Sequence, residues 1–152
     1  MFEREDVDTN KFWADREQLK GGKLRFFTFA TLLGRSGEKA ITLGGLLYII
    51  DDTITFEDFE KDNWLFKLMN RKKSYEKTEF DLKVADIAET KLVSKNTALN
   101  CISGNLPDTN TKPLNGFNLL FNQKVFQLRL KSGNSLFFEI MKAKEFGETL
   151  SS

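Results

Sequence analysis

The chain contains no histidine, which removes the commonest general base and metal ligand of proteins. Its single cysteine, Cys101, cannot form an intramolecular disulfide, which fits a reducing compartment. A zinc site is therefore not expected, because such sites are built largely from cysteine and histidine. Glycine-rich phosphate loops are also lacking, since Gly44-Gly45 and the Gly34/Gly37 pair have neither the required spacing nor a following helix. The sequence predicts no catalytic residue, no metal and no cofactor.

Charge of one sign and long hydrophobic runs are equally scarce. The 23 basic and 22 acidic residues give a net charge of +1, which argues against nucleic acid as a partner and permits self-association. The longest apolar run, 43–50 with its two glycines, is far shorter than the roughly 20 residues of a membrane span. The first residues are acidic and lack the apolar core of a signal peptide. We therefore expect a soluble, cytoplasmic protein.

What the chain has in abundance is phenylalanine, at 15 of 152 residues, and a length that suits one domain of ordinary size. Aromatic and β-branched residues alternate with polar ones between short turns, which is typical of antiparallel strands. The paired glycines Gly44-Gly45 are expected to allow a bulge or a sharp bend. Strands are expected at residues 24–33, 39–43, 46–50, 53–57, 75–84, 90–93, 98–102, 125–130 and 135–141.

Helical signals stand at the two ends of the chain. Residues 8–20 predict a short helix that Asp8, Thr9 or Asn10 can cap and Gly21-Gly22 can end, and it should pack on the outside of the main domain. The segment after 141 predicts a closing helix. Its core-facing anchors are Phe146 and Leu150, which are four residues apart. Residues 103–116 hold both prolines and predict a loop.

These elements predict a mainly β fold. We expect a bent antiparallel barrel or sandwich of about seven strands, with a C-terminal capping helix and a short N-terminal helix. A barrel is favoured, because the last helix can plug one end. We divide the chain into an N-terminal helical extension, 1–23, and a main domain, 24–152.

Aromatic residues fall on both faces of the first strand. Side chains alternate between the faces of a strand, so Phe26 lies on one face and Phe27 and Phe29 lie on the other. One face must belong to the core. The other is expected to be covered by the N-terminal helix or by another subunit.

The best candidate for a binding site follows the third strand. An apolar group beside a basic cluster suits an anionic membrane surface or an acidic partner. The same apolar residues could instead cover an open end of the barrel, with the cations as a solvated rim. The candidate residues are Trp64, Leu65, Leu68, Met69, Arg71, Lys72 and Lys73.

Three segments carry a resemblance to a known family. Residues 45–57, Gly-Leu-Leu-Tyr-Ile-Ile-Asp-Asp-Thr-Ile-Thr-Phe-Glu, resemble a segment of GRAM and bacterial pleckstrin-homology (PH)-like domains. Residues 79–89 and 125–150 are similar to later segments of those domains, including the last hairpin and the closing helix. The resemblance implies a strongly bent sheet of seven strands capped by a C-terminal helix, and a binding or scaffolding role.

The chain departs from that family at two places. Many PH domains have a tryptophan in the closing helix, where the nearest aromatic residue here is Phe146. Lipid-binding members carry a basic cluster around the first hairpin, where this chain has only Arg35 and Lys39 with Glu38 between them. The second departure weakens the case for phosphoinositide binding.

Other functions remain open from the residues alone. The favoured function is a non-enzymatic binding or scaffold module acting through protein contacts or self-association, and the alternative is a peripheral module for anionic lipid. The carboxylates Asp51-Asp52, Glu57-Asp58, Glu60 and Asp62 could serve a hydrolase or a hard cation, but turn chemistry and solvated strand edges explain them as well. A carrier of a small apolar ligand is a further alternative. Cys101 is expected to be a buried, inert thiol in an apolar strand.

Overall fold

The computed structural model describes residues 2–59, 78–114 and 124–151, and it confirms a mainly β fold. Seven antiparallel strands form one sheet in the order β4-β3-β2-β1-β7-β6-β5. The strands are β1 (Leu24–Arg35), β2 (Leu43–Ile50), β3 (Thr53–Asp58), β4 (Glu79–Lys83), β5 (Ile87–Ser94), β6 (Lys124–Leu130) and β7 (Ser135–Ile140). The α-helices in the described ranges are α1 (Phe2–Lys20), α3 (Lys95–Ile102) and α5 (Ala143–Ser151). Short 3-10 turns occur at η2 (Val84–Asp86) and η3 (Asp108–Asn110).

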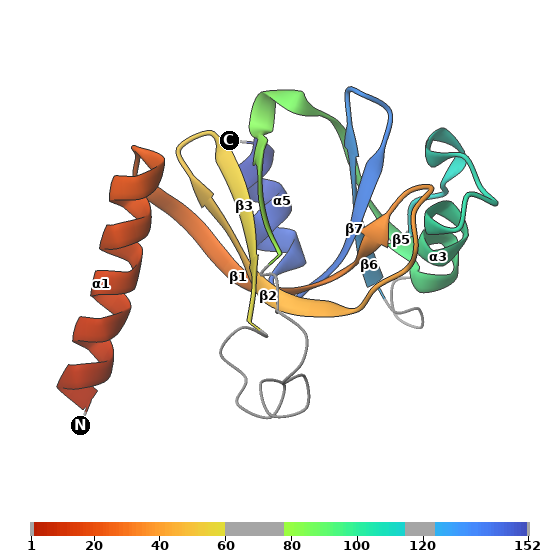
Figure 1. Cartoon of the computed structure of the whole chain (residues 1–152). Helices are drawn as coiled ribbons and strands as arrows, with labels where there is room; N and C mark the ends of the chain where they lie inside the picture. The colour runs from red at the N-terminus through yellow and green to blue at the C-terminus, as the bar shows by residue number, and fades with distance from the viewer. Residues whose placement is uncertain (1, 60–77, 115–123, 152) are drawn as a thin grey trace.

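The sheet bends around α5, which lies on its concave, inner face (Figure 1). β1 makes the bend possible because it is long enough to pair with β2 along most of its length and with β7 over its second half. Its pairing with β7 shifts register between Leu32 and Gly34, and such a bulge bends a strand and increases its twist. The sheet is not closed, because β4 and β5 stand at its two ends.

The inner core is built from aromatic rings that meet under α5. Phe56 of β3 contacts Phe138 of β7 with ring centroids 5.6 Å apart, and Phe126 of β6 contacts Phe146 of α5 at 5.1 Å. Phe146 is fully buried and Leu150 packs against the same cluster, which confirms both predicted anchors of the closing helix. Burying one such ring stabilises the fold by about 1.5–3 kcal/mol.

A second core lies on the convex, outer face, where α3 covers the β5–β7 half of the sheet. The prediction of a strand at 98–102 is wrong, because this segment is helical. The Oγ of Ser94 accepts a hydrogen bond from the backbone N–H of Thr97 and caps α3, and Ala98, Cys101 and Ile102 share its buried face. The spacing of these residues is helical, but the short run also reads as an apolar strand.

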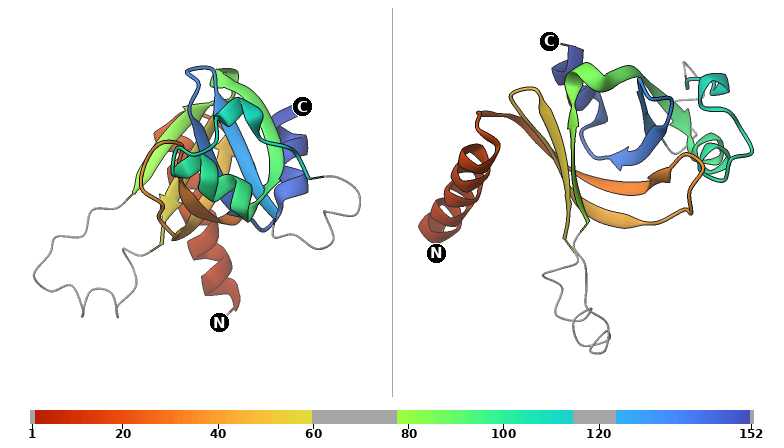
Figure 2. Two further views of the ribbon diagram at one scale, coloured as in Figure 1. Left: turned by 90° about the vertical axis from the view of Figure 1, so that its right-hand side faces the viewer. Right: turned by 45° about the horizontal axis from the view of Figure 1, so that its top comes forward.

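Helix α1 stands beside the β1–β4 half of the sheet (Figures 1 and 2). It begins at Phe2, so the predicted caps at Asp8, Thr9 and Asn10 fall inside the helix. Its end agrees with the prediction: Gly21 has a φ of 75°, and its N–H donates to the carbonyl of Glu17.

Within the glycine pair near the start of β2, Gly45 permits a close approach of β3. The register with β1 and β3 runs through Gly44-Gly45 without a shift, so no bulge forms there. A Cβ on Gly45 would lie 2.8 Å from Cζ of Phe56 and nearer still to the Glu57 carbonyl oxygen. Only glycine lets the Phe56 ring cross this strand.

Candidate functional site

The predicted binding segment, Trp64 to Lys73, lies outside the described residues. Its seven candidate side chains therefore keep the status of a prediction. The strand before it ends at Asp58, and Phe59 follows at the last described position of that segment. The described residues nearest to this segment are Phe59 and its neighbours on the outer face of the sheet.

The carboxylates named in the sequence analysis have structural partners where they are described. Asp51 occupies the β2–β3 turn with a φ of 52°, and its carboxylate accepts a hydrogen bond from the backbone N–H of Lys23. Asp58 accepts from the backbone N–H of Thr78 next to β4. Within the described ranges, no group of three metal-ligating side chains comes together. The turn interpretation of Asp51 is therefore the one that the contacts support.

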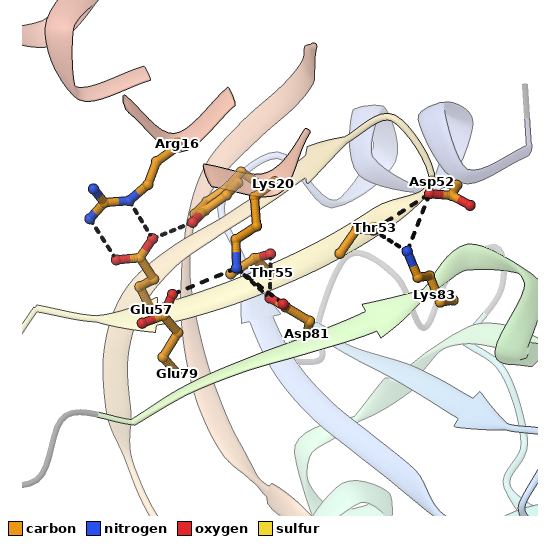
Figure 3. A network of polar contacts seen from close by, with 10 residues as sticks. Arg16, Lys20, Asp52, Thr53, Thr55, Glu57, Glu79, Asp81 and Lys83 are labelled. Carbon is orange, nitrogen blue, oxygen red and sulfur yellow. Dashed lines mark hydrogen bonds and ion pairs between the residues drawn. The ribbon is translucent and has the colours of Figure 1, made fainter. Parts of the chain in front are cut away.

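Glu57 is the centre of a polar network beneath α1 (Figure 3). Its side chain is 4% exposed and forms a bidentate ion pair with Arg16, with both N–O distances at 2.9 Å. The hydroxyl of Tyr48 donates a hydrogen bond to the same carboxylate. A buried carboxylate needs such partners, because burying an unpaired charge is costly. This network fixes α1 to β2 and β3.

A second contact of α1 lies one helical turn further along. The Lys20 ammonium is 2.8 Å from a carboxylate oxygen of Asp81 on β4, and Thr55 donates to that oxygen at the same distance. Lys20 also lies 3.8 Å from Glu79. Arg16 and Lys20 are four residues apart, so they project from the same side of the helix toward neighbouring strands.

The electrostatics of this network follow from its burial and pairing. Burial and the neighbouring Glu57 carboxylate raise the pKa of Tyr48 above its usual range, so this phenol stays protonated. The hydrogen bond to Glu57 raises the pKa of Arg16. Burial works to raise the pKa of Asp81, but hydrogen bonds from Lys20 and Thr55 outweigh it, and the net shift is downward. The raised pKa of Arg16 and the lowered pKa of Asp81 favour the charged forms of both groups, which reinforces the attachment of α1.

Trp13 adds an apolar contact between α1 and the sheet. Its ring lies 4.9 Å from Phe27 of β1 and 5.2 Å from Tyr48 of β2, measured between centroids. The N-terminal helix therefore contacts the outer aromatic face of the first strand at Phe27 but covers it only in part, because Phe27 is still 40% exposed. Phe26 packs against the inner core, 6.2 Å from Phe146.

Phe29 is the more exposed of the two rings that β1 places on the outer face. It is 50% exposed, and it forms with Leu46, Phe59 and Met141 a surface that we call the outer patch. Phe59 is 43% exposed and lies 5.7 Å from Phe29 between ring centroids, and Met141 is 73% exposed. Pairing holds the patch in place: Leu46 lies opposite Phe29, and the N–H of Met141 donates to the Phe29 carbonyl.

The outer patch surrounds a shallow hollow of about 420 Å³. Gly44 and Thr31 line this hollow, and so do the charged residues Lys124 and Glu139. Glu139 is also 3.4 Å from Lys95 of α3. An apolar centre bordered by charges of both signs is the general form of a protein-binding surface. The sequence placed aromatic rings on both faces of β1, but the extent to which Phe27 and Phe29 remain exposed depends on tertiary contacts.

Cys101 is buried, as expected, but in α3 and not in a strand. Burial, and after it the Asp108 carboxylate, raises the pKa of its thiol to about 11. A thiol with this pKa is protonated near neutral pH and is a poor nucleophile. Its environment supports an inert, structural cysteine.

Comparisons with known proteins add a fold and no function. No protein-family model and no curated protein matches this chain. A solved structure, described as the C-terminal domain of an unknown protein from Leishmania infantum, is similar to it with a TM-score of 0.51 and 11% sequence identity. The match covers 93% of each chain, so the whole architecture recurs in that domain. In the described residues, no helix is long and apolar enough to cross a membrane.

Proposed function

We propose that this protein is a non-enzymatic binding module of the PH/GRAM-like type that acts through protein contacts at the outer patch. The bent sheet of seven antiparallel strands and the C-terminal helix on its inner face agree with what the family resemblance implies. The likeness to the Leishmania domain supports the architecture alone, because fold similarity does not carry function.

The observation that carries the proposal is the joint exposure of Phe29, Phe59 and Met141. Phe59 and Met141 follow the ends of β3 and β7, and their N–H groups donate to carbonyls of β2 and β1. Helices cover the outer face on both sides of this surface: α1 packs on β2 and β3, and α3 packs on β5–β7. Large apolar side chains that remain exposed in contact with one another indicate an interaction surface. The rigid strands beneath them keep the surface ordered before a partner binds, which lowers the entropic cost of binding.

A capture experiment with matched variants tests the proposal. The immobilised protein is compared with Met141→Glu in the patch and with Leu19→Glu on α1, because Met141 and Leu19 are equally exposed at 73%. Proteins that the wild type and Leu19→Glu retain and Met141→Glu loses are then purified and titrated against all three forms. A weakening of at least about tenfold for Met141→Glu alone supports the proposal. Equal binding by all three forms contradicts it.

The second candidate is binding to an anionic membrane surface. Lys124 at the border of the patch, and Lys142, which lies 5.9 Å from the Phe27 ring, place cations near exposed apolar residues. The predicted basic cluster, Arg71 to Lys73, would add about 1 kcal/mol for each cation near such a surface. Sedimentation with acidic liposomes tests this function: salt-sensitive binding that is lost when Arg71, Lys72 and Lys73 are changed to glutamate supports it. Cosedimentation that these changes leave intact contradicts a role for the cluster.

A further inference from the structure

We infer that the partner of the outer patch is a second copy of this chain, paired about a two-fold axis that passes beside Phe29. This inference rests on the proposed function and specifies the partner. A two-fold interface joins one surface to itself, so each protrusion must meet a depression of the same surface, and each charge must find its opposite there. The outer patch satisfies both conditions.

The shape of the patch is self-complementary because a protruding side chain and the hollow lie next to each other beside Phe29. Met141 is the protrusion, next to Phe29 on the β7 side. The hollow extends from Met141 past Thr31 to Gly44, where a built Cβ would meet no atom nearer than Cδ2 of Phe59, at 4.0 Å. A two-fold rotation beside Phe29 places Met141 of each copy in the hollow of the other.

Charge also permits the surface to meet itself. The border carries Lys124 as well as Glu139, so a rotated copy can bring opposite charges together at the rim. A rim of one sign would repel its copy. The net charge of the whole chain is only +1, so long-range repulsion between two copies is weak.

The exposed area predicts the strength of the pairing. With about 200 Å² for a large side chain, Phe29, Phe59 and Met141 together expose roughly 330 Å². A stable interface of standard size buries about 800 Å² on each partner, so polar rim residues must supply more than half of the contact. A dimer with such a small apolar centre should dissociate in the micromolar range and not at nanomolar concentration.

Sedimentation velocity from about 1 to 500 µM tests the inference on the full chain. The wild type should pass from monomer to dimer, Met141→Glu should raise the dissociation constant at least about tenfold, and Leu19→Glu should leave it unchanged. Circular dichroism and thermal unfolding of the three forms show whether each is folded. A wild type that stays monomeric over the whole range overturns the inference, as does equal dimerisation of wild type and Met141→Glu.

Cross-linking locates the axis independently. A Phe29→Cys variant in a Cys101→Ala background should form a disulfide-linked dimer under mild oxidation, because the two copies of residue 29 lie on either side of the axis. The matched variant Leu19→Cys should not. Dimers that cross-link equally well through position 19 would overturn the assigned interface.

The two proposals can fail separately. If the protein is monomeric but Met141→Glu still loses another captured protein, this inference fails and the proposed function stands. If binding that depends on the outer patch is also lacking, both fail.

Discussion

Replacing Arg16 by alanine is the most informative test of how α1 is held on the sheet. The guanidinium satisfies both oxygens of a Glu57 carboxylate that is almost completely buried. The substitution removes the guanidinium from that carboxylate, whereas the Tyr48 hydroxyl still donates a hydrogen bond to it. The buried Glu57 carboxylate then has to bind a proton, or α1 has to move away from the sheet and admit water.

The loss of stability caused by Arg16→Ala can be estimated from the structure. Removing one partner of a fully buried ion pair costs about 3–5 kcal/mol. Arg16 is 24% exposed and Tyr48 still donates to Glu57, so we expect a smaller loss, about 2–3 kcal/mol of the free energy of unfolding. For a domain of about this size, each 1 kcal/mol lowers the melting temperature by about 2–4 °C, which predicts a decrease of roughly 4–12 °C.

Urea unfolding and calorimetry measure this loss, and Trp13 fluorescence shows whether α1 has left the sheet. A Trp64→Phe background isolates the Trp13 signal, which should shift to the red when its contacts with Phe27 and Tyr48 open. Lys11→Ala is the matched control, because Lys11 is an exposed cation on the same helix. A loss below about 0.5 kcal/mol for Arg16→Ala, or an equal loss for Lys11→Ala, would refute the argument that the buried pair fixes α1.

Three further outcomes are expected. Gly45→Ala should lower stability by about 1–3 kcal/mol in urea unfolding, because its Cβ would collide with β3, whereas Gly44→Ala, whose Cβ meets only an atom at 4.0 Å, should not; equal effects would contradict the close approach. Phe146→Ala removes a fully buried ring between the sheet and α5 and should cost about 3–5 kcal/mol; a loss near zero would show that α5 does not hold the inner core. The thiol of Cys101, with its pKa raised to about 11, should react with iodoacetamide at pH 8 far more slowly in the folded than in the denatured protein, and its rate should rise as pH approaches that value; equal rates in both states would contradict burial of the thiol.

Local patterns were sufficient for much of the sheet. The predicted strands at 53–57, 125–130 and 135–141 are confirmed, because each pairs with a strand adjacent to it in sequence. The predicted closing helix and its anchors Phe146 and Leu150 are also confirmed. Two apolar residues that are four apart lie on the same side of a helix, so they identify the side that is buried.

Where the prediction failed, the deciding contacts are distant in sequence or the signal is ambiguous. Residues 98–102 form a helix because Ser94 caps it and because its buried side meets Leu33 and Phe137 on the outer face of the sheet. The outer patch could be anticipated only in part. The alternation along β1 placed Phe27 and Phe29 on one face, but the contact of Trp13 with Phe27 and that of Phe59 with Phe29 depend on the tertiary structure.

The sequence by itself determined the class of the fold, the absence of histidine chemistry and the elements that close the domain, because these depend on composition and on periodicity within one segment. Only the tertiary structure decided that Glu57 is buried beneath Arg16 and that Phe29, Phe59 and Met141 come together. Arg16 is on α1 and Glu57 on β3, whereas Phe29 is on β1 and Phe59 and Met141 follow the ends of β3 and β7. Their proximity results from the register and the bend of the sheet, which depend on pairing between distant segments and not on the pattern of any one of them.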